Sequence, residues 1–153
     1  MYEQNASNKD RFIQDFQQID KVSSSSVKPK AKPFLYPFQM EAVNRAFNGC
    51  VFNGKVGSGK SRTGLFYYFK EQGGWIDENG YVPMKNPKDL YIITTAMKRD
   101  KAEWNGELIP FKMYPKPELN YYNNKIVIDS WNNIKKYIDV TDGFFIFDEQ
   151  RVV

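Results

Sequence analysis

The chain has no histidine, and Cys50 is its only cysteine. A lone cysteine cannot form an intrachain disulfide, and without histidine the chain cannot build a His-dependent catalytic triad or a zinc site of the usual kind. Any bound metal ion must therefore be held by oxygen ligands. Cys50 stands in a short apolar stretch, which predicts a buried structural side chain rather than a reactive one.

Long apolar runs are also missing. No stretch approaches the roughly 20 residues that are needed to cross a membrane, and the N-terminus lacks the charged and apolar regions of a signal peptide. These absences predict a cytoplasmic protein in a reducing environment. With 153 residues, 41% of them apolar and 16% aromatic, the chain fits one folded domain and leaves no room for a second full one.

Positive charge is only slightly in excess. Lys and Arg number 22 against 18 Asp and Glu, so the formal net charge is +4. An excess of this size permits a nucleic-acid partner without requiring one.

The first 32 residues differ in composition from the rest. A run of four serines is followed by alternating lysine and proline, which predicts a polar tether. Inside it Phe12, Ile13, Phe16 and Ile19 recur at helical spacing, so we expect a short amphipathic helix from about residue 9 to residue 20. The folded domain is expected to cover residues 33–153.

Apolar runs alternate with helical segments through this domain. We expect strands over Cys50–Phe52, Leu90–Thr95, Lys125–Ile128 and Phe144–Phe147. We expect helices over Met40–Phe47, Ser61–Lys70 and Met97–Leu108, a hairpin turning at Asn79-Gly80 within Trp75–Val82, and an irregular connection over Pro110–Pro117. This alternation predicts an α/β domain with a mainly parallel sheet flanked by helices.

Residues 54–61, Gly-Lys-Val-Gly-Ser-Gly-Lys-Ser, match the phosphate-loop pattern between a predicted strand and a predicted helix. Glycines let the backbone curl so that its N–H groups and the helix N-terminus point at the phosphates of ATP. Lys60 would reach the β- and γ-phosphates, and the Ser61 hydroxyl would ligate Mg²⁺. The expected nucleotide contacts in this region are Gly54, Gly57, Ser58, Gly59, Lys60, Ser61 and Arg62. The alternative is a glycine-rich turn with an incidental Lys-Ser pair.

Two carboxylates follow the last apolar run, as they do in a Walker B strand. Asp148 would hold Mg²⁺, and Glu149 would orient and deprotonate the attacking water. Lys60, Asp148 and Glu149 are thus the candidate catalytic residues, and Ser61 and Asp148 the candidate metal ligands. The alternative is a pair of solvated loop charges.

The segment Asp148-Glu149-Gln150-Arg151 resembles the Asp-Glu-x-x box of the second helicase superfamily. From about Phe34 to its end, the chain looks most like the N-terminal motor domain of helicase-like proteins from tailed bacteriophages, akin to the chromatin-remodeller branch. The resemblance implies a RecA-like P-loop NTPase fold, and the host cytoplasm as its location. Gln39, in Tyr-Pro-Phe-Gln, is similar to the glutamine motif that reads the adenine edge. The alternative is an exposed glutamine at a helix start.

Two further segments match the family's nucleic-acid-contacting motifs more weakly. They contain Thr95, Lys98 and Arg99 after one strand, and Ser130 and Trp131 after another. Hydroxyls, cations and helix N-termini at strand ends suit phosphate contacts. The resemblance implies a nucleic-acid partner, DNA more than RNA. The plainer interpretation is a solvated helix start and a packing tryptophan.

The family places its coupling motif, its second motor domain and its arginine finger after the Asp-Glu box. Loss of an arginine finger lowers the rate by about 10³ to 10⁵, so the resemblance implies slow hydrolysis by this chain alone. It also implies an unfilled slot in the sheet, because the family's next strand lies between the phosphate-loop strand and the Asp-Glu strand. We therefore expect a partial, ATP-binding motor domain of a DNA helicase-like or translocase-like ATPase. A terminase ATPase and a nucleotide-binding module without turnover are the alternatives.

Overall fold

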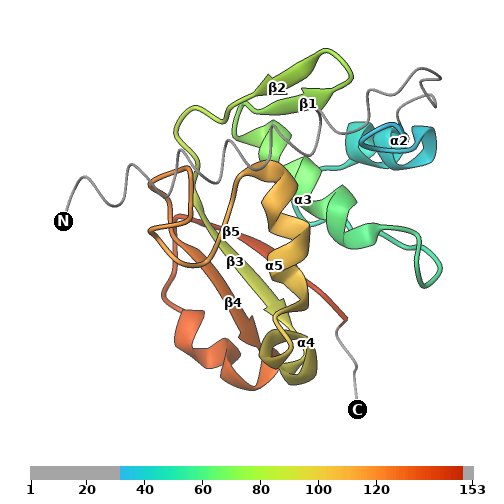
Figure 1. The fold of residues 1–153 in the computed structure, drawn as a ribbon. Helices are drawn as coiled ribbons and strands as arrows, with labels where there is room; N and C mark the ends of the chain where they lie inside the picture. The colour runs from blue at the N-terminus through green and yellow to red at the C-terminus, as the bar shows by residue number, and fades with distance from the viewer. Residues whose placement is uncertain (1–31, 150–153) are drawn as a thin grey trace.

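The computed structural model describes residues 32–149, which form a small α/β domain with helices beside a parallel sheet (Figure 1). The helices, in chain order, are α2 (Pro37–Arg45), α3 (Lys60–Glu71), α4 (Ala96–Asp100) and α5 (Glu103–Leu108), with 3₁₀ turns η1 (Ile109–Phe111) and η2 (Trp131–Tyr137). The strands are β1 (Trp75–Asp77), β2 (Gly80–Val82), β3 (Asp89–Thr94), β4 (Ile126–Ser130) and β5 (Gly143–Phe147). The helix expected near residues 9–20 lies outside the described residues.

The main sheet has three parallel strands in the order β4-β3-β5, which confirms the predicted α/β class and parallel pairing. Ile92 in the central strand stands opposite Ile128 of β4 and Ile146 of β5. Five of the six β3 residues are buried, as expected for a strand that is paired on both sides and covered on both faces. Within residues 32–149, no strand pairs with the other edge of β5.

Helices α3 and α5 cover one face of this sheet (Figure 1). Helix α3 buries every residue from Thr63 to Phe69, so it is apolar over most of its circumference. The Phe66 ring meets the rings of Phe111 and Trp75 edge-on, and Tyr68 meets Phe144 at 5.0 Å between centroids. These aromatic contacts fix the helix that follows the glycine loop against the strand that ends in the two carboxylates.

A row of aromatic rings runs across the opposite face of the sheet. Tyr91 stacks on Phe145 at 4.9 Å, Phe145 on Phe147 at 5.6 Å, and Phe147 on Trp131 at 5.3 Å between centroids. Tyr137, from the end of η2, packs against Tyr91. Phe147 remains 58% exposed, so η2 covers this face only in part.

The hairpin predicted at Asn79-Gly80 is present. Strands β1 and β2 pair antiparallel, and the Asp77 carboxylate accepts the Asn79 backbone N–H at 2.8 Å. The Tyr81 hydroxyl donates to the Phe111 carbonyl oxygen at 2.9 Å and contacts the Tyr122 hydroxyl, which ties the hairpin to the core.

The prediction of a strand over Cys50–Phe52 was wrong. These residues have no regular structure, Val51 is 88% exposed, and Cys50 is only partly buried, contrary to the prediction for its side chain. Three apolar residues between two Asn-Gly pairs are too few to order themselves, and a strand needs a neighbour to satisfy its backbone. The edge of β5 is open, yet this segment does not pair with it.

The helix predicted over Met97–Leu108 is two helices. Ala102 lies between α4 and α5 with φ of 53°, a left-handed conformation that no helix contains. The break re-aims α5, which buries Trp104 and Leu108, whereas α4 buries nothing.

The remaining differences concern the ends of elements. Helix α2 begins at Pro37, three residues before the predicted start, where the Gln39 side chain caps the Tyr36 N–H, and it ends at Arg45 rather than Phe47. The 3₁₀ turn η1 reaches into the connection that was expected to be irregular from Pro110. Strand β4 runs two residues beyond the predicted end, to Ser130. None of the helices in residues 32–149 is long and apolar enough to span a membrane.

Candidate functional site

The glycine loop leads directly into α3. Gly57 and Gly59 have φ of 80° and 76°, values that favour glycine, and Gly59 is the N-cap of the helix. Lys60 is the first helical residue, so the loop lies at the positive end of a 12-residue helix. The turn and helix start that the phosphate-loop pattern predicts are both present, although the strand before them is not.

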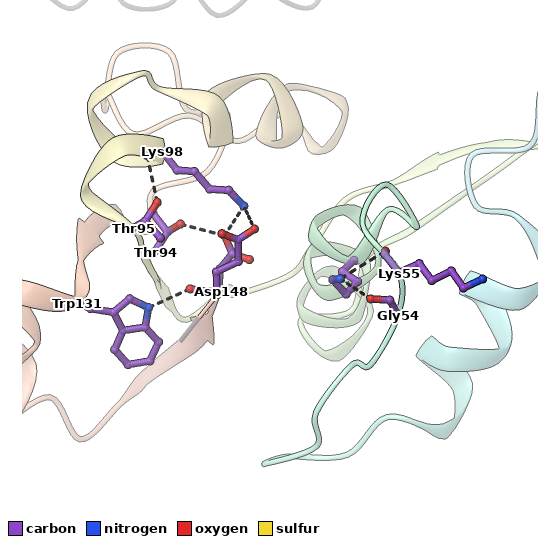
Figure 2. Close-up of polar contacts among 9 residues, drawn as sticks. Gly54, Lys55, Thr94, Thr95, Lys98, Trp131 and Asp148 are labelled. Atoms are coloured by element: carbon purple, nitrogen blue, oxygen red, sulfur yellow. Dashed lines mark hydrogen bonds and ion pairs between the residues drawn. The ribbon is translucent and has the colours of Figure 1, made fainter. Parts of the chain in front are cut away.

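The Lys60 ammonium group folds back over this loop. It donates to the Gly54 carbonyl oxygen at 2.6 Å and lies 3.4 Å from the Lys55 carbonyl oxygen (Figure 2). Ser61, the candidate metal ligand, is partly buried beside it in the first turn. Arg62 points elsewhere, because its Nε lies 3.8 Å from Glu107 and its guanidinium lies over the Phe34 ring at 5.5 Å.

Gln39 connects α2 to the loop. Its amide oxygen accepts the Tyr36 N–H at 2.8 Å, and its amide nitrogen donates to the Ser58 carbonyl oxygen at 3.0 Å. The side chain is buried, so the exposed glutamine considered as an alternative is wrong. The contact is close: a Cβ on Gly59 would lie 2.2 Å from the Gln39 amide nitrogen. In this arrangement Gln39 holds the loop in position.

Asp148 and Glu149 stand at the carboxyl end of β5 and share one cation. The Asp148 backbone N–H donates to the Ile93 carbonyl oxygen at 2.8 Å, and its carboxylate accepts the Thr94 hydroxyl at 2.9 Å. Lys98 lies 3.1 Å from the Asp148 carboxylate and 2.8 Å from that of Glu149 (Figure 2). Burial lowers the pKa of Lys98, but the hydrogen bonds to the two carboxylates outweigh it and raise that pKa above its ordinary value.

Trp131 is bonded to the same segment. Its indole N–H donates to the Asp148 carbonyl oxygen at 2.9 Å, and its ring stacks on Phe147. The sequence offered a nucleic-acid contact or a packing residue, and the observed side chain does pack. Its hydrogen bond also holds the backbone of Asp148, a candidate metal ligand, and no local sequence pattern predicts this contact.

Arg99, Asp129 and Ser130 form a second network at this edge of the sheet. Asp129 accepts hydrogen bonds from the Ser130 N–H, Asn133, Tyr137 and Arg99 at 2.6 to 3.0 Å. Burial raises the pKa of this carboxyl group, but the four donors together bring it well below its ordinary range. Burial and the bond to Asp129 raise the pKa of Tyr137 to about 12.

The weaker nucleic-acid candidates therefore gather where the strands end. Thr95 caps α4 by accepting the Lys98 N–H at 3.3 Å, while Lys98 and Arg99 are paired with carboxylates rather than freely solvated. Sequence reasoning placed Thr94 at the start of the first weaker segment but did not predict its contact with Asp148, and it gave Asn133 and Tyr137 no role of their own. Asn133 and Tyr137 lie in η2, and their spacing does not indicate that they contact Asp129.

The site thus consists of two groups. The first is the loop of residues 54–61 with Gln39, and the second is the acidic pair with Thr94, Lys98 and Trp131. Figure 2 shows Gly54 and Lys55 of the first group apart from Lys98 and Asp148 of the second. No hydrogen bond or ion pair between described residues joins them.

Metal-binding capacity follows from the donor atoms. The part of the chain that the structure describes contains no cluster of three or more His, Cys, Asp or Glu side chains suited to a metal ion. Asp148 and Ser61 offer the hard oxygen donors that Mg²⁺ takes when phosphate oxygens and water complete its shell. Their chemistry therefore fits a metal carried by a nucleotide better than a resident one.

Gln150 and Arg151, the last two residues of the Asp-Glu-x-x box, lie outside the described residues.

Comparison of the chain with protein-family models, with curated proteins and with solved structures finds no match.

Proposed function

We propose that this chain is the ATP-binding motor domain of a helicase-like or translocase-like ATPase, with a RecA-like P-loop fold and a nucleic-acid partner, DNA above RNA. In a longer protein, this domain couples ATP hydrolysis to movement on that partner. The observation that carries the proposal is the glycine loop with two left-handed glycines that ends in Lys60 at the N-terminus of α3.

The strand order supports the same assignment. The strand that ends in Asp148 lies beside the strand that precedes Thr95, and the strand that ends in Ser130 lies on its far side. All three strands have their carboxyl ends on the same side of the sheet, where ligands of parallel α/β sheets bind. The open edge of β5 corresponds to the slot that the resemblance implies.

Each residue then has a role in phosphoryl transfer. The loop N–H groups and Lys60 bind the phosphates, which requires the ammonium group to leave the Gly54 carbonyl. Magnesium held by Ser61 and Asp148 would offset the charge on the phosphates. Glu149 orients a water molecule and accepts its proton. Gln39 keeps the loop attached to α2 through Ser58.

The test is Mg·ATP binding and turnover by the purified chain, with and without single- and double-stranded DNA. We expect binding by isothermal titration calorimetry, little turnover without DNA, and loss of binding in Lys60→Ala. Lys55→Ala is the matched control, since Lys55 is an exposed lysine of the same loop. Retained affinity in Lys60→Ala would remove the site assignment.

Turnover is tested separately from binding. Glu149→Gln is expected to keep nucleotide affinity within about twofold and to abolish whatever phosphate release the wild type shows, because the amide cannot accept a proton. Equal rates in the two proteins would show that Glu149 is not the base.

A nucleotide-binding module without turnover is the second candidate. It is favoured by the separation of the two groups, because residues 50–52 lie outside the sheet and no described hydrogen bond or ion pair joins Lys60 to Asp148. Binding that is unaffected by Asp148→Asn, with no phosphate release even with DNA, would select this module over the motor.

A further inference from the structure

Lys98 connects the segment proposed to contact nucleic acid with the two carboxylates proposed to act in ATP hydrolysis. It belongs to the first turn of α4, the short helix that starts at the carboxyl end of β3, yet its ammonium group contacts both carboxylates at the end of β5. The Lys98 side chain is 22% exposed and that of Asp148 is 14% exposed, whereas that of Glu149 is 44% exposed. The bond to Asp148 is therefore better shielded from water than the bond to Glu149, and removing one partner of a shielded pair leaves the other charge uncompensated.

Glu149 is held in a conformation that it does not prefer. Its φ of 49° is left-handed, which is uncommon for a residue other than glycine and persists only when surrounding contacts impose it. In this conformation its carboxylate accepts a hydrogen bond from Lys98 at 2.8 Å. While it lasts, one acceptor position of the Glu149 carboxylate is occupied by the ammonium group rather than by water.

The environment of Lys98 also suits a phosphate. Lys98 and Arg99 are adjacent cations where the strands end, each paired with carboxylates, and such side chains are those that contact nucleic-acid phosphates. A phosphate of a nucleic acid that approached this edge would compete with the two carboxylates for the same ammonium group. One cation therefore has two possible anionic partners.

We propose that Lys98 is a positioning residue that restrains Asp148 and Glu149 until a nucleic-acid phosphate draws it away, so that contact with the strand releases the acidic pair for catalysis. This inference rests on the proposed function, because it assigns Glu149 the role of base. It adds the link between the nucleic-acid edge and the carboxylates, together with the residue that makes the link.

Trp131 provides a local signal for this event. Its indole N–H is bonded to the Asp148 carbonyl oxygen, so a change in the Asp148-Glu149 backbone alters the surroundings of that ring. The chain has two other tryptophans, Trp75 and Trp104, both in the core on the α3 side of the sheet. Incorporation of 5-fluorotryptophan gives three ¹⁹F resonances, and Trp131→Phe identifies the one from position 131.

The experiment records these spectra without nucleotide while single-stranded DNA is added. We expect the Trp131 resonance of the wild type to shift and the Trp104 resonance to stay. Lys98→Met should show the shifted position before any DNA is added, and further DNA should then move it little. Lys98→Arg should behave like the wild type, since the guanidinium retains the charge. Lys101→Met is the matched control, because Lys101 is an exposed lysine at the end of the same helix.

Turnover offers a second reading. If the wild type hydrolyses ATP faster with DNA, Lys98→Met should have a raised rate without DNA, and its DNA stimulation should fall close to onefold. An unchanged Trp104 resonance shows that the variant is folded, so a lost signal cannot be blamed on unfolding.

Two outcomes would overturn the inference. One is an identical Trp131 resonance in the wild type and Lys98→Met. The other is a DNA-induced shift of equal size in both, which would mean that DNA acts on Trp131 directly. Failure of the proposed function would look different: Mg·ATP would not bind, whatever the ¹⁹F spectra show.

Discussion

Two buried polar side chains of this domain are held by hydrogen bonds to more than one partner. Gln39 uses its amide oxygen and nitrogen to connect two segments, and Asp129 accepts from four donors. Removing one partner of such a group costs more than a surface hydrogen bond does, because the others lose their geometry or remain unpaired. Both side chains are therefore good positions for a substitution test.

Replacement of Asp129 by Asn should lower the free energy of unfolding by about 1–3 kcal/mol at pH 7, because the charged acceptor of four hydrogen bonds is lost. The folded protein holds the pKa of Asp129 below its unfolded value of about 4. The stabilisation is therefore complete above that value and is lost as the pH falls toward the folded pKa. Urea unfolding of both proteins from pH 7 to pH 3 should show the difference shrinking below about pH 4; a constant difference would contradict this origin.

Gly59 is the other informative position. Gly59→Ala should cost about 1–2 kcal/mol for the left-handed backbone alone, and more because its Cβ would lie 2.2 Å from the Gln39 amide nitrogen. In a Gln39→Ala background only the backbone part should remain. A double-mutant cycle from chemical denaturation measures this coupling, and purely additive effects would mean that the contact is relaxed in solution.

At the scale of elements, the sequence predicted what local pattern determines. The hairpin follows from Asn79-Gly80, and the glycine turn with Lys60 at a helix start follows from residues 54–61. Strands β3 and β5 are apolar runs that pair with each other, β3 buried and β5 mostly half-buried, so their existence was predictable. The segment Cys50–Phe52 is also apolar, but it is short and lies unpaired outside the sheet.

The contacts of the site were less predictable than its residues. Nothing in the spacing of Lys98 and Glu149, or of Trp131 and Asp148, indicates that these pairs meet. They meet because three strands end at one edge, and that follows from strand order rather than from sequence pattern. The helix break at Ala102 was not predicted for a similar reason. Alanine is a good helix former, but the burial of Trp104 outweighs that preference.

That break can be tested directly. Ala102→Gly should raise the free energy of unfolding by up to about 1 kcal/mol, because glycine adopts φ of 53° without the cost of a Cβ. Ala96→Gly, in the first turn of α4, is the matched control and should lower stability by up to about 1 kcal/mol. Thermal and urea unfolding of the three proteins decide it. If both glycines destabilise, residues 96–108 form one continuous helix in solution.

For the molecule as a whole, the question is whether its two groups of site residues act together. The loop of residues 54–61 is attached through α2 and α3, and the acidic pair through β3, β5 and Trp131. Strand β3 is paired on both sides and should hold the slowest-exchanging amides of the domain, while residues 50–56, exposed and irregular, should exchange fastest.

Hydrogen exchange with Mg·ATP therefore separates the two candidate functions. In a motor domain, a single nucleotide bridges both groups, so amides of residues 54–62 and those at the end of β5 should slow together, because binding stabilises only the conformation that brings them into contact. In a binding module, protection should be confined to residues 54–62. Lys60→Ala should lose both effects, whereas Asp148→Asn should lose only the one at β5 in a motor and neither in a module. Lys60 and Asp148 lie on segments that no described hydrogen bond or ion pair joins, although α3 packs against β5 through Tyr68 and Phe144. Protection at the end of β5 that is lost in Asp148→Asn while the loop stays protected therefore indicates a nucleotide in contact with both groups.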